Sequence, residues 1–155
     1  MKMHLPCRSF TFLATFFYIG YIPFAPGTFG SLAGVLLFIC VFSKLPPLIY
    51  IIILATLFFL GIWASEKTDD FYKTHDNSII VIDEVVGMLA SLFLIPFTWK
   101  NVFLGFLLFR IFDIIKVPPA NILDRKKTGF GTMGDDLVSG VYANIALCFI
   151  SRFWS

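Results

Sequence analysis

The feature that most constrains the fold is a series of apolar segments, each close to the length that crosses a membrane. The chain has 155 residues, of which 58% are hydrophobic and 14% are charged, and its mean hydropathy is +0.86. A soluble domain of this length needs far less apolar surface. At about 20 residues per span, the chain has room for roughly four to six helices and no separate soluble module. The apolar segments are residues 10–22, 29–42, 48–64, 79–97, 102–117 and 137–154.

We therefore expect one domain, residues 1–155, with an all-α fold: a polytopic membrane bundle of about five to six helices, some short or re-entrant. Only residues 48–64 form an uninterrupted apolar run near the required length. The first run, residues 10–22, follows Lys2 and Arg8 and resembles a signal peptide, but no small-x-small cleavage site comes after it. We expect it to stay in the mature chain, as a full span or a re-entrant helix.

Charge and cysteine content exclude some classes of partner and site. The net charge of +2 argues against a nucleic-acid partner. The three cysteines, Cys7, Cys40 and Cys148, are far apart and lack the paired spacing of a zinc site or a disulfide framework. We interpret all three as small hydrophobic residues.

The polar residues fall on one side of the predicted membrane. If the last five apolar segments each cross once, one side receives residues 23–30, 65–78 and 118–136. All ten acidic residues lie on that side or at its membrane edge, together with most of the Lys and Arg residues of the loops. The positive-inside bias makes this side cytoplasmic. Its most polar stretch, residues 66–75, is expected to extend a helix beyond the membrane.

The acidic residues are predicted to reach one depth from three different helices. Asp83 and Glu84 lie within the apolar stretch IIVIDEVVGM, at the cytoplasmic start of one span. Asp113 lies near the cytoplasmic end of the next, and Asp135 with Asp136 opens the last. Such carboxylates repel one another unless they are protonated or bound to a cation, and clustered oxygen ligands suit Mg2+.

Helix capping is the alternative interpretation, because a helix N-terminus favours an acid by about 0.3–1 kcal/mol. For either acidic pair alone, capping is the better explanation. Asp113 lies near a helix C-terminus, where the helix dipole disfavours an acid, so the whole set favours a metal site. Asp83 precedes Gly87 by four residues and Asp136 precedes Gly140 by four, so each acid shares a helix face with a residue that lets another helix approach closely.

Cations occur beside the acids at helical spacing. Arg110, Asp113 and Lys116 recur every three residues, so they follow one stripe of a helix. One interpretation is an intrahelical ion-pair ladder. The other, which we favour, is that Arg110 and Lys116 bind phosphate oxygens while Asp113 binds the metal.

Three further segments are weaker candidates. The stretch PGTFGS opens a helix whose free N–H groups, with the hydroxyls of Thr28 and Ser31, suit an anion, although such turns more often serve as caps. Residues 129–131 are expected to form a flexible loop beside the site. His75 and Asp76 are additional candidates for the polar site, against the alternative that a lone loop histidine is solvated.

The motifs together resemble a known family, the phosphatidylglycerophosphatase A type of membrane phosphatase. The matching stretches are PGTFGS at 26–31, HDNSIIVIDEVVGM at 75–88, FRIFDIIK at 109–116 and DRKKTGFGTMGDD at 124–136. They cover most of the chain from Pro23 onward, and their joint order is specific. One departure is Val117, which stands between Lys116 and the following prolines, where the family commonly has proline directly after the lysine.

The resemblance implies Mg2+-dependent removal of the terminal phosphate from phosphatidylglycerophosphate, at the cytoplasmic face of a bacterial inner membrane. The partners that it implies are this lipid and the bilayer. On this hypothesis the metal ligands are Asp83, Glu84, Asp113 and Asp136. The catalytic set is Asp83, Asp113 and Asp135, with Asp135 a further ligand or the base. The phosphate-binding set is Thr28, Ser31, Arg110 and Lys116. Attack by water and attack by an aspartate both stay open.

Two other functions are weighed against this one. A CDP-alcohol phosphotransferase also uses clustered membrane aspartates, but its D-G-x-x-A-R arrangement is absent from the sequence. A small cation channel or transporter would line an ion path with acids. Because the acids are confined to one face of the membrane, a through-pathway is disfavoured.

Overall fold

The computed structural model describes residues 9–74 and 77–153, and in this part of the chain all regular structure is helical. The prediction of an all-α fold is confirmed. The described residues form seven α-helices and two short 3-10 helices, more elements than the five to six predicted. The elements are α1 (Ser9–Ala14), η1 (Ile19–Tyr21), α2 (Pro26–Cys40), η2 (Phe42–Lys44), α3 (Pro47–Tyr72), α4 (Ile82–Ser91), α5 (Trp99–Ile115), α6 (Ala120–Asp124) and α7 (Gly129–Phe153).

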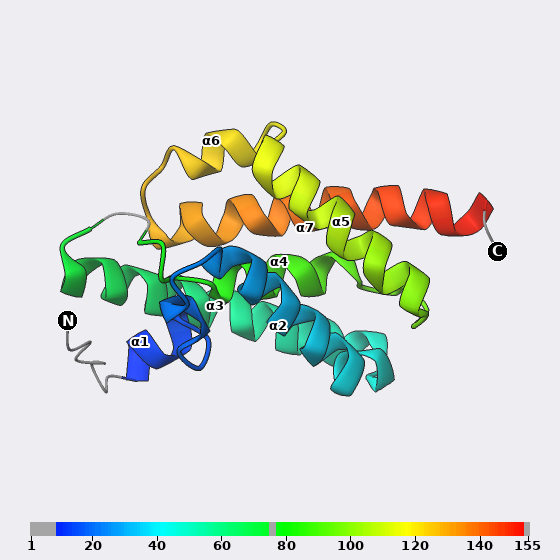
Figure 1. The fold of residues 1–155 in the computed structure, drawn as a ribbon, viewed down its shortest axis with the longest axis horizontal. Coiled ribbons are helices and arrows are strands. Elements are labelled where there is room, and N and C mark those ends of the chain that lie inside the picture. The colour runs from blue at the N-terminus through cyan, green and yellow to red at the C-terminus, as the bar shows by residue number, and fades with distance from the viewer. Residues whose placement is uncertain (1–8, 75–76, 154–155) are drawn as a thin grey trace.

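Among the described residues, three helical segments are long and apolar enough to cross a membrane: Pro26–Lys44, Pro47–Tyr72 and Gly129–Arg152. The long helices run back and forth along the molecule (Figure 1). The start of α2, the end of α3, the end of α5 and the start of α7 therefore lie toward the same end, on the left of Figure 1. This alternation agrees with the predicted segregation of polar segments to one side.

The first apolar run does not form a span. Its helix α1 has only six residues, and the chain then turns through Phe16, Phe17 and Tyr18, all of which have positive φ. Buried side chains of Thr11 and Ala14 anchor α1 to the bundle. Of the two alternatives for residues 10–22, the full span is therefore excluded.

The segment 79–97 was expected to be a span, but its helix α4 ends at Ser91. Ten residues extend about 15 Å, half of a hydrocarbon core of about 30 Å. The end is stabilised from neighbouring helices: Asn144 donates hydrogen bonds to the carbonyls of Ser91 and Phe93, at 3.0 and 2.8 Å, and Tyr50 donates to Leu89 O at 2.7 Å. Carbonyls freed by an early helix end must be satisfied inside the protein, and these donors do so.

Helix α4 is the centre of the bundle. It packs against α2, α3, α5 and α7, and every one of its residues except Glu84 is buried. An acidic pair at the start of such a helix is enclosed by protein rather than by lipid. The charge of this pair must therefore be balanced inside the protein.

The crossing of α4 and α7 depends on two glycines. A Cβ atom on Gly140 would collide with the carbonyl oxygen of Gly87. A Cβ atom on Gly87 would lie 2.7 Å from Asp136 O and 2.6 Å from a ring carbon of Phe109. The predicted role of these glycines in close helix approach is confirmed, and it brings Asp83, one turn before Gly87, toward Asp136, one turn before Gly140.

The last helix begins earlier than expected. Residues 129–131 were predicted to form a flexible loop, but they are the first turn of α7. Asp135 and Asp136 consequently lie in its second turn rather than at its start. Because the favourable dipole effect falls off within the first turn, capping explains these two acids poorly.

Candidate active site

A polar cavity of about 310 Å³ lies where α2 and α7 begin, α5 ends and α4 starts. Its volume is within the range of small-ligand sites, about 300–1,000 Å³. Five carboxylates and two positively charged side chains of the predicted set line it, so the cavity joins residues that are far apart in the sequence. The lining residues are Pro26, Gly27, Asn77, Ser78, Ile80, Asp83, Glu84, Arg110, Asp113, Lys116, Thr132, Asp135 and Asp136.

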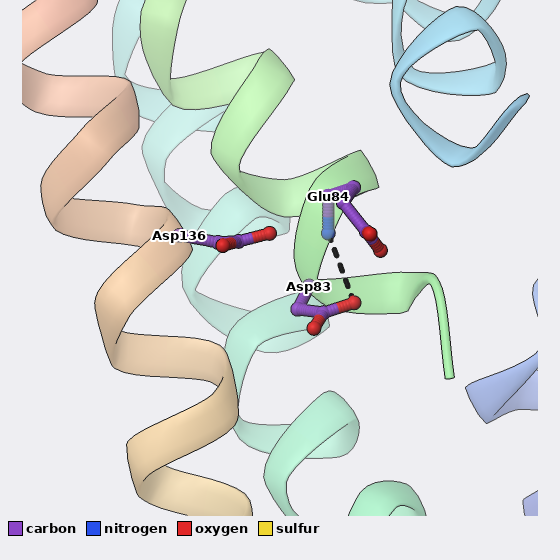
Figure 2. Close-up of side chains that lie close together, drawn as sticks. All are labelled: Asp83, Glu84 and Asp136. Carbon is purple, nitrogen blue, oxygen red and sulfur yellow. Dashed lines mark hydrogen bonds between the residues drawn. The ribbon is translucent and has the colours of Figure 1, made fainter. Parts of the chain in front are cut away.

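Three of the predicted metal ligands form the tightest group. Carboxylate oxygens of Asp83, Glu84 and Asp136 lie within 4.8 Å of one another. Figure 2 shows Asp136 projecting from α7 toward the first turn of α4, where Asp83 and Glu84 are held by a hydrogen bond from Glu84 N to Asp83 Oδ1 of 3.0 Å. Asp83 and Asp136 are 8% and 4% exposed, so bulk water does little to screen their repulsion.

Glu84 is the least satisfied member of this group. Its Oε2 atom is buried and has no hydrogen-bond partner among the described residues. A buried charged oxygen without a partner is costly unless a cation binds it. Gly27 makes room for this side chain, because a Cβ atom there would collide with Glu84 Oε1.

The donor set fits a hard divalent cation. Oxygens that share one Mg2+ at about 2.1 Å lie about 3 to 4 Å apart, and the oxygens of this group lie within 4.8 Å of one another. Three carboxylates supply the oxygen ligands that Mg2+ prefers, and the cavity has room for the waters that it usually keeps. The residues that would hold it are Asp83, Glu84 and Asp136.

Asp113 lies on the cavity wall but outside this group of three. Its Oδ2 atom pairs with Nη1 of Arg110 at 2.7 Å, and the same nitrogen donates to Ser31 Oγ at 3.3 Å. The intrahelical ion pair weighed from the sequence therefore exists between these two residues. Asp113 also lines the cavity, so its role as a metal ligand stays a prediction.

Lys116 does not continue the helical stripe, because α5 ends at Ile115 and Lys116 is its left-handed C-cap, with φ 50°. Its Nζ atom donates to Asp135 Oδ2 at 2.6 Å and also to Asp124 Oδ1 on α6. Burial acts to lower the pKa of the ammonium group, but the hydrogen bonds and charges of these two acids outweigh it, so the net shift of its pKa is upward. Lys116 is thus a fixed cation at the cavity rim. The departure at Val117 lies just beyond it.

Two of the weaker candidates, Thr28 and Ser31, are not among the residues that line the cavity. Ser31 Oγ accepts a hydrogen bond from Arg110 and donates one to Gly27 O at 2.9 Å. Thr28 is in the first turn of α2. His75 and Asp76 lie outside the described residues.

Sequence reasoning missed three polar lining residues, Asn77, Ser78 and Thr132. The family resemblance could have indicated them, because each of the three lies inside one of the stretches that match the family. Asn77 is anchored by a hydrogen bond from its N–H to Asp69 Oδ1 of 3.2 Å, which connects the segment after α3 to the end of that helix. The polar rim is therefore built partly by a loop, where no helical spacing reveals it.

Comparisons with known proteins agree with this site. The family model of phosphatidylglycerophosphatase A matches residues 12–151. A phosphatidylglycerophosphatase A of Haemophilus influenzae is 41% identical over 92% of this chain and 88% of its own length, and that of Escherichia coli K12 is 36% identical over 92% and 83%. A Bacteroides thetaiotaomicron protein, named provisionally as a phosphatidylinositol-3-phosphatase, is 37% identical over 87% and 89%. No solved structure matches. The chain belongs to the phosphatidylglycerophosphatase A family, a family of phosphatases.

Proposed function

We propose that this enzyme removes the terminal phosphate of phosphatidylglycerophosphate, yielding phosphatidylglycerol, in a reaction that depends on Mg2+. The observation that carries the proposal is the group of Asp83, Glu84 and Asp136, in which one buried oxygen has no described partner. The same cavity is lined by two positively charged side chains, Arg110 and Lys116. The names of the Haemophilus and Escherichia relatives supply the substrate class.

Each side chain has a role that follows from its position. Asp83, Glu84 and Asp136 would hold Mg2+, which when bound polarises a phosphoryl oxygen and lowers the pKa of a bound water. Arg110 and Lys116 bind the remaining phosphate oxygens, and they exchange their carboxylate partners for phosphate as it enters.

Asp135 is the carboxylate best placed to act as the base. Its carboxylate accepts a hydrogen bond from Asp136 N–H on Oδ1 at 3.0 Å, and the other described donor to this carboxylate is Lys116. When Lys116 binds phosphate, Asp135 Oδ2 becomes free to accept a proton from the attacking water. The water oxygen bonds to phosphorus, and the ester P–O bond breaks. The released alkoxide of the lipid takes a proton from solvent water, and Asp135 returns the proton it accepted to the solvent, so the protons balance. Asp113 holds Arg110 in place before the phosphate enters, and its role as a metal ligand stays part of the proposal.

Phosphate release from detergent-purified protein tests this function. We expect activity on phosphatidylglycerophosphate to disappear in EDTA and return with Mg2+, and Asp83→Asn to remove most of it while the protein still inserts and folds. Asn caps a helix about as well as Asp, so normal turnover in this variant would mean that the acid is only a cap. Equal activity in excess EDTA would remove the metal from the proposal.

Substrate choice needs its own comparison because one relative is named for a different lipid. The same assay with phosphatidylinositol 3-phosphate presents a phosphate on a ring alcohol instead of a glycerol end. We expect phosphatidylglycerophosphate to be preferred. A higher kcat/KM for the inositol lipid would reassign the substrate and leave the site chemistry unchanged, whereas equal turnover of soluble glycerol phosphate would argue against a membrane-presented substrate.

We also propose that the cavity faces the cytoplasm in a bacterial inner membrane, because the positive-inside bias favours that side for the polar segments. Single cysteines replacing Thr74 or Thr128, in a chain without native cysteines, should react with an impermeant reagent only after intact cells are opened. A cysteine at Ser43, in η2 just beyond the opposite end of α2, is the control that should react in intact cells. The reverse pattern would invert the topology.

A further inference from the structure

A second hollow lies beside the polar cavity, between α2 and α5. Its volume is about 280 Å³, and every residue that lines it is apolar. Two come from α2 and four from α5: Leu32, Val35, Trp99, Val102, Phe103 and Phe106. We call it the α2–α5 groove.

The groove and the polar cavity share the same two helices. On α5, Arg110 of the cavity lies four residues after Phe106 of the groove, so the two side chains occupy one helix face. On α2, Gly27 of the cavity comes about one and a half turns before Leu32 of the groove. Because the helices are antiparallel, the groove residues of both helices lie in the same direction from the cavity, away from the polar end of the molecule (Figure 1).

The groove lies at the level in the membrane where the acyl chains of a bound lipid would be. Along α5, Phe106 is about 6 Å and Val102 about 12 Å from the level of Arg110, at 1.5 Å per residue. One leaflet of hydrocarbon is about 15 Å thick. A lipid whose phosphate reaches Arg110 therefore has its acyl chains at the level of the groove.

We propose that the α2–α5 groove binds an acyl chain of the same lipid whose phosphate enters the polar cavity, an inference that rests on the proposed function. Any apolar surface in a membrane touches lipid, but this groove is concave, and on α5 it begins about one helical turn from Arg110 of the headgroup site. It holds one tail of the substrate in a fixed place and thereby positions the phosphate between Arg110 and the acidic group. The groove thus favours diacyl phosphate esters over their soluble headgroups.

The chain offers a matched pair of variants. Leu32 lines the groove and is 46% exposed, whereas Leu60 on α3 is 44% exposed and lies outside it. Leu32→Trp fills the groove, and Leu60→Trp makes the same change on another lipid-facing helix. We expect Leu32→Trp to lower the kcat/KM ratio of long-chain to dihexanoyl phosphatidylglycerophosphate about tenfold, the effect of displacing about two methylene groups. Leu60→Trp should leave the ratio at the wild-type value, and equal ratios in both variants would overturn the proposal.

A binding measurement keeps this inference separate from the proposed function. We would use a phosphatidylglycerophosphate analogue with a diazirine midway along one acyl chain and map its crosslinks in wild-type protein. Crosslinks should concentrate on the groove residues of α2 and α5 and decrease with unlabelled phosphatidic acid but not with phosphatidylcholine. Uniform labelling of α3 and α7, without such competition, would overturn the groove. Competed labelling of the groove in a protein that releases no phosphate would instead support the groove and refute the proposed reaction.

Discussion

The two acidic pairs of the site have similar sequence patterns and different surroundings. Asp83–Glu84 and Asp135–Asp136 are both adjacent acids, and a glycine follows Asp83 and Asp136 at the same spacing. The first pair starts the central helix, and Glu84 Oε2 has no described partner. The second pair is divided, because Asp135 binds Lys116 while Asp136 faces the first pair. Two adjacent acids can therefore become two kinds of carboxylate, and the contacts with neighbouring helices decide which kind each one is.

Glu84→Gln tests this division with the largest expected effect. Gln keeps the shape of the side chain and removes a buried charge that lacks a partner, so thermal stability in detergent should be unchanged or higher. Activity should fall about 10³-fold, because the metal-assisted stabilisation of phosphate charge is lost. Phosphate release and thermal unfolding of the same preparation check both expectations. A stable variant with near-normal turnover would place Glu84 outside the chemistry.

Asp135→Asn tests whether the second pair contains a base that does not bind the metal. We expect kcat to fall about 10²-fold, the usual contribution of a general base, while the Mg2+ concentration that gives half-maximal activity stays near the wild-type value. Lys116 keeps its second partner, Asp124, so the fold should persist. The measurement is a titration of activity against Mg2+ concentration. A rise in the Mg2+ concentration needed for half-maximal activity would instead mean that Asp135 is a metal ligand like the other acids of the site.

Gly140→Ala tests the crossing that brings the pairs together. The new Cβ meets the backbone of Gly87, which cannot move aside, so the free energy of unfolding should fall by about 1–3 kcal/mol. Gly134→Ala on the same helix is the control, because its Cβ lies 3.2 Å from a terminal methyl group of Leu123, which can shift. Thermal unfolding in detergent compares the two. Equal stability of both variants would show that close approach at Gly87 is unnecessary.

The sequence predicts much of the site because its signals are local. Helical spacing placed each acid on the face of its glycine, and the order of motifs identified the family. The early end of α4 was not predictable, because its carbonyls are satisfied by Tyr50 and Asn144, which are distant in sequence. The prediction of a loop at residues 129–131 was wrong, because two glycines so close together are more typical of a loop than of a helix. A Cβ atom at Gly129 would lie 2.6 Å from Ile62 O, so the first turn of α7 packs directly against α3, which only glycine allows.

The central claim is that Asp83, Glu84 and Asp136 together bind one kind of ligand, a divalent cation, and that Asp135 does not take part. Calorimetric titration of Mg2+ into detergent-purified protein, without lipid substrate, tests it most directly. We predict saturable binding to wild type, similar affinity in Asp135→Asn, and affinity at least about tenfold weaker in Asp136→Asn, which loses one of three charged oxygen ligands. Equal affinity in all three proteins, or no saturable binding to wild type, would contradict the account.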